Sequence, residues 1–238
     1  IAGMNFTLHF AAIRNLSFKS YFKSLENKCF LSVILISFLV VFYSLLSTNS
    51  SDDYFDLIRM SLFNVVSIAT TTGYSTEDYN QWPTIAFPLM ILLSCFTSCS
   101  GSTGGGVKMI RIIIMLKQAK RELFRTIHPH AVIPIKIGES TVGNKVVLAV
   151  LAFMFFYLLT LLITFLTLTA TGLSGGASIS ASLACLNNLG PALFELGPTS
   201  NYGSLNNFQL SVLSIAMLLG RLELLTIFVF FSNAFWKS

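Results

Sequence analysis

The sequence predicts an all-α membrane protein in which long spanning helices alternate with short helices and glycine-centred loops. Hydrophobic residues make up 54% of the chain and charged residues only 11%, whereas a soluble domain carries about 25% charge. Several apolar runs are long enough to cross a bilayer. Basic and acidic residues lie in separate stretches, which is typical of membrane topology and argues against a nucleic-acid-binding protein.

These stretches divide the chain into four segments. We assign residues 1–28 to the end of a preceding helix and a cytoplasmic linker, and residues 117–143 to a second, basic cytoplasmic linker. Two segments of similar design, 29–116 and 144–238, follow the linkers. The chain opens within a pattern and without a recognisable signal peptide, so we interpret it as the C-terminal piece of a longer membrane protein.

The segment 29–116 begins with a predicted span at 29–47. Residues 54–70 have the apolar spacing of a helix but are too few to cross a bilayer. A second span begins near Thr84, is interrupted at 98–106 and ends at Leu116. We therefore expect a short helix that enters the membrane and returns, followed by a broken span.

The segment 144–238 repeats this order, with a span at 144–170, a short helix at 173–187 and a last span at 208–232. Gly73 and Gly190, which follow the two short helices, are 117 residues apart. Both segments have the same orientation, so the repeat is parallel and predicts rotational symmetry about a central pore. A filter of this design normally has four loops, so this chain would hold two of four repeats.

The distribution of charge predicts the orientation. The positive-inside rule places residues 1–28, the basic region 108–145 and the C-terminus in the cytoplasm. The acidic region 48–83 then faces the outside. These assignments give four crossings, with both chain ends cytoplasmic and both short helices entering from the outside.

Two loops are candidates for an ion selectivity filter: Thr71, Thr72 and Gly73 in the first, and Asn188, Leu189 and Gly190 in the second. Glycine reaches the backbone conformations that turn carbonyl groups toward a pore. Each loop follows the C-terminal end of a short helix, where the helix dipole favours a cation. The alternative is an ordinary extracellular turn, but the repetition of the arrangement favours the filter.

A glycine-rich stretch interrupts the second span and is a candidate gate, consisting of Gly101, Ser102, Thr103, Gly104, Gly105 and Gly106. It does not match the phosphate-binding P-loop, because Val107 precedes Lys108 and Met109 follows it. Non-helical backbone at this depth is tolerated only inside protein or beside water. We expect a flexible loop beneath the filter, with a helix kink or a packing site as the alternative.

Arg221 and Glu223 lie within the predicted last span. An ionisable residue at such a depth indicates a functional role by default. We expect Arg221 to reach carbonyl groups of the glycine-rich stretch or to oppose cations electrostatically. The alternative is a structural role in a buried ion pair.

Few other residues suggest a catalytic or ligand-binding site. The sequence holds no nucleophile–base pair and no paired carboxylates in a plausible pocket, so we expect neither an enzyme nor a cofactor in this chain. The four cysteines lie in apolar segments and are interpreted as packing residues. The basic stretch 117–125 is either a topology signal alone or a surface for lipid phosphates or a cytosolic partner.

As a set, the motifs resemble those of a known family. They are residues 70–76, residues 100–108, Glu122-Leu123 with His128-Pro129, residues 187–191 and Gly220-Arg221-Leu222-Glu223. Together they resemble the membrane subunit of Trk/Ktr-type potassium uptake systems, and most closely its bacterial TrkH branch. The resemblance covers essentially the whole chain, as the C-terminal two of that family's four span–pore–span repeats.

The resemblance implies potassium transport through one central filter, with ion contacts at the six filter residues and a glycine-rich loop, near Arg221, that obstructs the pore below. It also implies a multi-pass protein of the bacterial inner membrane, completed by the N-terminal half of the same protein. Homodimers and a cytosolic nucleotide-binding ring subunit that regulates opening are further implications. From the residues alone, an ion-coupled secondary transporter of a small solute is the alternative, followed by a non-transporting scaffold.

Overall fold

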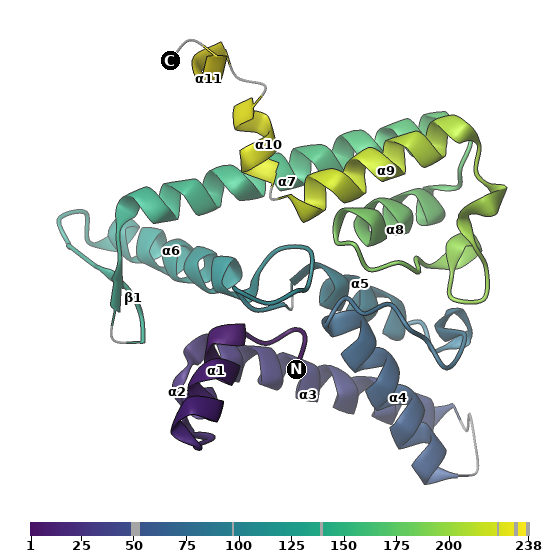
Figure 1. Ribbon diagram of the computed structural model, residues 1–238, viewed down its shortest axis with the longest axis horizontal. Helices are drawn as coiled ribbons and strands as arrows, with labels where there is room; N and C mark the ends of the chain where they lie inside the picture. Colours follow the sequence, from purple (N-terminus) through teal and green to yellow (C-terminus); the bar gives the residue numbers. More distant parts are fainter. Residues whose placement is uncertain (49–52, 97, 139, 223, 231–232, 237–238) are drawn as a thin grey trace.

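Figure 1 shows a helical molecule in which the helices of the two repeats lie side by side. The computed structural model describes residues 1–48, 53–96, 98–138, 140–222, 224–230 and 233–236. The α-helices are α1 (Phe6–Asn15), α2 (Lys19–Lys23), α3 (Leu25–Ser47), α4 (Tyr54–Ala69), α5 (Ala86–Phe96), α6 (Met109–Ile127), α7 (Asn144–Ala170), α8 (Gly175–Leu186), α9 (Asn207–Arg221), α10 (Leu224–Phe230) and α11 (Asn233–Trp236). Three short 3-10 helices, η1 (Tyr79–Gln81), η2 (Phe194–Leu196) and η3 (Tyr202–Ser204), and two strands, β1 (Ile135–Ile137) and β2 (Ser140–Val142), lie between them.

The helices α3 and α7 correspond to the predicted spans at 29–47 and 144–170. They contain 23 and 27 residues, and by length and composition each is able to cross a membrane. Many of their large apolar side chains are exposed, among them Leu35, Ile36, Leu39, Tyr43, Phe155, Leu158 and Leu162. Both helices therefore present an outward apolar surface, as lipid-facing helices do.

The short helices α4 and α8 lie where the sequence predicted them. The Asp53 carboxylate accepts a hydrogen bond from the Phe55 amide at 2.9 Å and so starts α4. The Ser174 hydroxyl accepts one from the Ala177 amide at 3.4 Å and so starts α8. Each short helix packs against the helices that precede and follow it, α4 against α3 and α5, and α8 against α7 and α9.

The second span is broken, as predicted, but its second part is longer than predicted. The helix α6 begins at Met109 and continues to Ile127, whereas the apolar run predicts an end at Leu116. The boundary that we drew between 116 and 117 therefore falls inside α6. Lysine, arginine, glutamate and glutamine are strong helix formers, so the helix persists where the apolar run stops.

The linker 117–143 contains a β hairpin, which the all-α prediction did not include. The strands β1 and β2 pair antiparallel, with Ile135 opposite Val142 and Ile137 opposite Ser140. Ile135 is buried against Ile114 of α6 and Val147 of α7. The strand forms because alternate isoleucines find an apolar surface on these two helices.

The last span is not one straight helix, which corrects the prediction for 208–232. A capping box formed by Asn206 and Gln209 starts α9, and α9 ends at Arg221. The next helix, α10, is bent by 104° relative to α9. Arg221 therefore lies at the end of a helix rather than in the middle of one, and Glu223 lies outside the described residues.

One core unites the two repeats. Buried side chains from α3, α4, α5, α7, α8, α9 and the second filter loop form a single cluster that includes Val41, Leu57, Val65, Met90, Leu93, Leu168, Ala181, Leu189 and Leu213. The helix α5 packs against α8, so it joins the first repeat to the second. This joint brings the C-terminal ends of α4 and α8 to the same region of the molecule, where the candidate filter residues lie.

Candidate functional site

The two filter loops have the same backbone. Each short helix is followed by one non-glycine residue in the left-handed region, Thr71 with φ 52° and Asn188 with φ 54°. Two residues later a glycine also has positive φ, 80° at Gly73 and 103° at Gly190. A β-branched threonine in this region is strained and persists only where its surroundings hold it, as is common at functional sites.

The hydrogen bonds of the two loops match as well. The Thr71 amide donates to the Ile68 carbonyl, and the Asn188 amide donates to the Cys185 carbonyl, both at 3.0 Å. The following amides, at Thr72 and Leu189, reach back five residues at 2.8 and 2.9 Å. Thr71 and Asn188 therefore carry different side chains on the same backbone turn, 117 residues apart.

The two loops contact each other at Gly73. A Cβ atom at this position would lie 2.1 Å from the Leu189 carbonyl oxygen and 3.2 Å from Pro191 Cδ. Glycine is required at residue 73 for two reasons, its positive φ and this close approach of a neighbouring backbone. Gly190 has open space around it, so only its φ requires glycine.

Unpaired carbonyl groups gather in these loops. Within the part of the chain that the structure describes, the carbonyls of Thr71, Thr72, Gly73, Asn188 and Leu189 accept no hydrogen bond. Both helices that lead into the loops end there, which adds the negative ends of two helix dipoles. The arrangement can therefore offer several oxygen ligands and a negative potential to a bare cation.

Tyr202 and Ser67 fix the outer ends of the loops. The Tyr202 hydroxyl donates to the Gly190 carbonyl at 2.9 Å, and the Ser67 hydroxyl donates to the Tyr74 carbonyl at 2.5 Å. Burial raises the pKa of Tyr202 further above its usual value, which already leaves the hydroxyl protonated and able to donate at neutral pH. Gly190 thus keeps one fixed carbonyl orientation.

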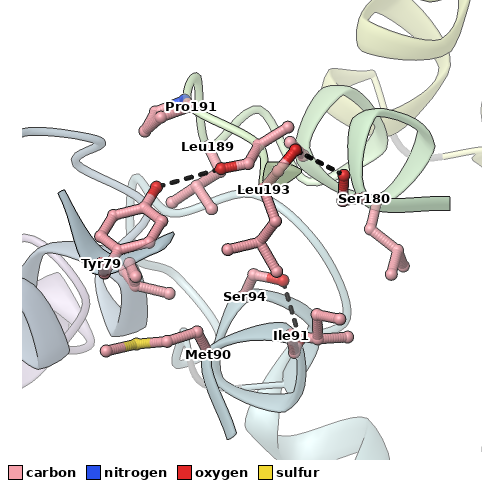
Figure 2. Close-up of a pocket in the computed structure, with 12 residues that line it drawn as sticks. Tyr79, Met90, Ile91, Ser94, Ser180, Leu189, Pro191 and Leu193 are labelled. Atoms are coloured by element: carbon pink, nitrogen blue, oxygen red, sulfur yellow. Dashed lines mark hydrogen bonds between the residues drawn. The ribbon is translucent and has the colours of Figure 1, made fainter. Parts of the chain in front are cut away.

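Figure 2 shows the packing behind the second loop. The Tyr79 hydroxyl, from the first repeat, donates to the Ala192 carbonyl at 3.2 Å, and the Ser180 hydroxyl donates to the Leu193 carbonyl at 3.3 Å. The cavity that remains between them is about 20 Å³, room for one water molecule at most. The loop is therefore backed by tightly packed protein.

Asn80 joins the two repeats beside this packing. Its side-chain amide donates to the Phe194 carbonyl at 3.1 Å, and its side-chain oxygen accepts from the Phe194 amide at 2.9 Å. The Thr199 hydroxyl also donates to the Asp78 carboxylate at 3.3 Å. These paired bonds hold η1 against the segment that follows the second filter loop.

The glycine-rich stretch 101–106 lies directly against both filter loops. The Gly105 amide donates to the Thr71 hydroxyl oxygen at 3.0 Å. A Cβ atom at Gly105 would lie 1.9 Å from the Asn187 carbonyl oxygen, the residue that ends α8. The stretch can approach this closely because it lacks side chains at these positions, so the predicted gate and the predicted filter are neighbours.

Asn187 links the second filter loop to the broken span. Its side chain is fully buried, and its oxygen accepts a hydrogen bond from the Tyr157 hydroxyl of α7 at 2.9 Å. Its amide lies 3.7 Å from the Cys95 sulfur. A Cβ atom at Gly106 would meet the same Asn187 oxygen at 2.6 Å, so this one side chain touches α5, α7 and the glycine-rich stretch.

Two cations hold the other side of the glycine-rich stretch. Arg221 donates to the Thr103 carbonyl at 2.9 Å, which is one of the two roles the sequence predicted for it. Lys108 donates to the carbonyls of Gly104 and Ser102. Together with Arg111, which stacks over the Phe153 ring at 3.8 Å, these cations line a cavity of about 260 Å³ beneath the stretch.

The glycine-rich stretch is also anchored at both flanks. The buried Glu26 carboxylate accepts hydrogen bonds from the Ser100 amide at 2.6 Å and the Ile110 amide at 3.2 Å. The Cys99 amide donates to the Gly3 carbonyl at 2.8 Å. The stretch between these anchors is therefore short and its ends are fixed.

Comparison with known proteins identifies the family. The family model for TrkH, described as a cation transport protein, matches residues 1–238. This chain belongs to the TrkH family.

The relatives of this TrkH-family chain are about twice as long. It is 41% identical over 241 residues to the Trk system potassium uptake protein TrkH of Vibrio parahaemolyticus, a match that covers 100% of this chain and 49% of the relative. The protein of the same name from Escherichia coli is 36% identical over 243 residues, with the same coverage of 100% and 49%. The chain thus spans about half the length of the curated relatives it matches, and it corresponds to their C-terminal half.

A solved structure has the same fold. The crystal structure of the potassium transporter TrkH from Vibrio parahaemolyticus superposes with a TM-score of 0.90 at 39% sequence identity, covering 99% of this chain and 50% of that chain. The largely helical architecture of the TrkH-family chain is therefore shared with that transporter.

Several residues of the TrkH-family site were missed by sequence reasoning. The sequence predicted Lys108 only as part of the basic cytoplasmic region and of the motif 100–108, without a role at the glycine-rich stretch, although a charge beside a glycine-rich break in a span was a signal for one. Glycine is also required sterically at residue 220, because a Cβ atom there would lie 1.8 Å from the Leu186 carbonyl oxygen. Asn80, Tyr157 and Tyr202 carry no local signal, since each acts through a contact distant in sequence.

Proposed function

We propose that this chain forms half of a potassium-conducting pore in a bacterial inner membrane. The observation that carries the proposal is the pair of matched loops, in which unpaired carbonyl groups gather at the C-terminal ends of two helices. The relatives named as potassium uptake proteins support potassium as the substrate. The rest of the full-length protein would supply the remaining loops of a four-loop filter.

In this proposal the filter residues are Thr71, Thr72, Gly73, Asn188, Leu189 and Gly190. A potassium ion sheds part of its water shell, and the loop carbonyls replace the lost ligands. Because the two loops carry different side chains on the same backbone, discrimination depends on carbonyl positions rather than on identical residues. The tight packing behind the second loop supports fixed carbonyl positions.

We propose the stretch 101–106 together with Arg221 as the gate. The stretch lies against both filter loops and is held by Arg221 and Lys108. Opening would require these bonds to break and the backbone to swing aside, and three adjacent glycines make such a movement possible. Cationic groups beneath the filter would also oppose the exit of potassium while the stretch is closed.

The remaining assignments complete the proposal. The protein would need no cofactor, and both ends of the chain would face the cytoplasm, as the positive-inside rule predicts. The family resemblance supports a homodimer that associates with a cytosolic nucleotide-binding ring subunit. Membrane lipid would cover the outward apolar faces of α3 and α7.

The test is flux through the full-length protein in liposomes, with rubidium as a substitute for potassium and sodium as the competitor. We expect selective rubidium uptake by the parent, and lost or unselective uptake by Gly73→Ser, because the new side chain meets the Leu189 carbonyl. Gly175→Ala is the matched control, since Gly175 has open space and needs no positive φ. Equal selectivity in Gly73→Ser and the control would refute the filter, and uptake that requires a co-solute would indicate a solute transporter.

A further inference from the structure

We propose that a cationic cavity between α6 and the β hairpin binds the phosphate group of an anionic phospholipid. The cavity has a volume of about 520 Å³. Its lining combines four cationic side chains with apolar ones, namely Lys117, Lys120, Arg121, Lys136, Phe124, Ile133, Pro134 and Ile135. This inference is independent of ion conduction, because the cavity is formed by other residues than the filter and the gate.

Arg121 forms the buried part of the cavity wall. The residue is only 8% exposed, and its Nη1 donates to Asn144 Oδ1 at 3.0 Å, which fixes the guanidinium against the start of α7. Among the described residues its Nε has no hydrogen-bond partner, and it makes only a long ion-pair contact of 3.8 Å with Glu122, a carboxylate that also pairs with Arg125 at 3.5 Å. A buried guanidinium with an unused donor favours an oxyanion ligand, and phosphate matches its geometry.

Three lysines surround this arginine without neutralising partners. Over the part of the chain that the structure describes, no ion pair involves Lys117, Lys120 or Lys136. Lys117 donates instead to the carbonyl of Lys136, which ties α6 to β1. Four cationic side chains line the cavity and one nearby carboxylate, Glu122, offsets them only in part, so the cavity favours an anionic ligand.

An apolar stripe of α6 that is exposed in this half of the protein favours a lipid as the source of the anion. Leu116, Leu123 and Ile127 are 67%, 71% and 73% exposed. Their spacing of seven and four residues places them on one stripe of α6. A soluble phosphate needs no such stripe, whereas a phospholipid can lay its acyl chains along it while its headgroup enters the cavity. Basic residues beside exposed apolar residues at the end of a span are typical of this mode of binding.

The site is built in advance. Ile135 is buried among Ile114, Val147 and Val150, so β1 is fixed on α6 and α7. The hairpin therefore holds Lys136 opposite the lysines of α6 without a ligand. A preformed site loses little free energy to ordering when the ligand arrives.

The experiment counts lipids bound to the purified full-length protein by native mass spectrometry. The protein in detergent is titrated with phosphatidylglycerol or phosphatidylcholine of the same acyl chains. One variant replaces Lys117, Lys120 and Lys136 with Gln, and a second is Arg121→Gln. The matched control replaces three exposed lysines of the other basic segment, Lys19, Lys23 and Lys28, with Gln.

We expect the parent and the control to prefer phosphatidylglycerol, and the cavity triple variant to lose this preference by about tenfold or more. Arg121→Gln should lose it as well, and melting curves of all variants identify any that fail to fold. Retention of the preference by the folded triple variant would overturn the proposal, as would an equal loss in the control.

Two further arms separate other sources of the anion. Displacement of the bound lipid by millimolar inorganic phosphate would assign the cavity to free phosphate instead. Binding of the purified regulatory subunit that is lost in the triple variant, with the lipid preference intact, would assign it to a protein partner. Either result would overturn the lipid site.

Discussion

The Thr71 hydroxyl accepts a hydrogen bond from the Gly105 amide at 3.0 Å. A residue of the proposed filter is thus bonded directly to the proposed gate. Movement of the glycine-rich stretch away from the pore breaks this bond, and the strained backbone at Thr71 loses one of its supports. In the proposed pore, the state of the gate and the shape of the filter would therefore be coupled through this bond and through the contact of Gly105 with the Asn187 carbonyl.

Thr71→Val tests this coupling. Valine keeps the shape of threonine but leaves the buried Gly105 amide without its acceptor, at a cost of roughly 1–3 kcal/mol to the closed arrangement. We expect basal rubidium flux to rise roughly fivefold or more in full-length protein. Thr126→Val, an exposed position on α6, is the control; unchanged flux in Thr71→Val would disprove the coupling.

Arg221→Ala removes the cation that donates to the Thr103 carbonyl. The glycine-rich stretch loses one of its two cationic anchors, so we expect basal flux to increase several-fold. The measurement is rubidium uptake without the regulatory subunit. Arg125→Ala removes the same charge from the far end of α6, where Arg125 pairs with Glu122 at 3.5 Å. If both variants behave alike, the effect is one of net charge and the gate role of Arg221 is wrong.

Tyr157→Phe removes the hydroxyl that donates to the buried Asn187 side chain. The Asn187 oxygen then lacks its donor in a dry environment, which costs about 1–3 kcal/mol. We expect a lower melting temperature and weaker discrimination of rubidium over sodium, because Asn187 supports the second filter loop. Tyr43→Phe, at an exposed position of α3, is the control and should change neither the melting temperature nor the discrimination. If Tyr157→Phe also leaves both unchanged, Asn187 does not support the second filter loop.

Asn80→Ala removes both hydrogen bonds to the Phe194 backbone. Because these bonds join the two repeats, we expect a melting temperature lower by a few degrees and a loss of transport at temperatures that the parent tolerates. Thermal unfolding of the full-length protein is the measurement. Asn207→Ala, at an exposed position, serves as the comparison, and equal stability of the two variants would contradict the clamp.

The sequence was sufficient for features that depend on local pattern. The apolar runs located α3, α4, α7 and α8 because burial in a membrane or beside it leaves a continuous signal. Gly73 and Gly190 were recognisable because both follow a short helix at the same offset. The break at 101–106 was evident because so many glycines cannot continue a helix.

Features that depend on distant contacts were not predictable. The hairpin of β1 and β2 forms on a surface made by α6 and α7, which hydropathy does not describe. The bend between α9 and α10 falls inside a run that is long enough for one straight span, and although Arg221 and Glu223 mark its middle as unusual, they do not by themselves predict a bend. The contact of Gly105 with Asn187 joins residues more than eighty positions apart, and only the folded chain brings them together.

The bonds around the filter are unevenly distributed between its two sides. On the side of η1 and η2, side chains of one repeat bind backbone of the other through Asn80 and Tyr79. On the side of the glycine-rich stretch, the filter contacts the backbone of residues 101–106, which is held through Thr71, Arg221 and Lys108. The proposed gate therefore lies on one side of the filter only. In the proposed pore, the closed stretch would leave the filter in exchange with the solution on the side of η1 and η2, so potassium from that side would occupy and stabilise the filter before the stretch opens.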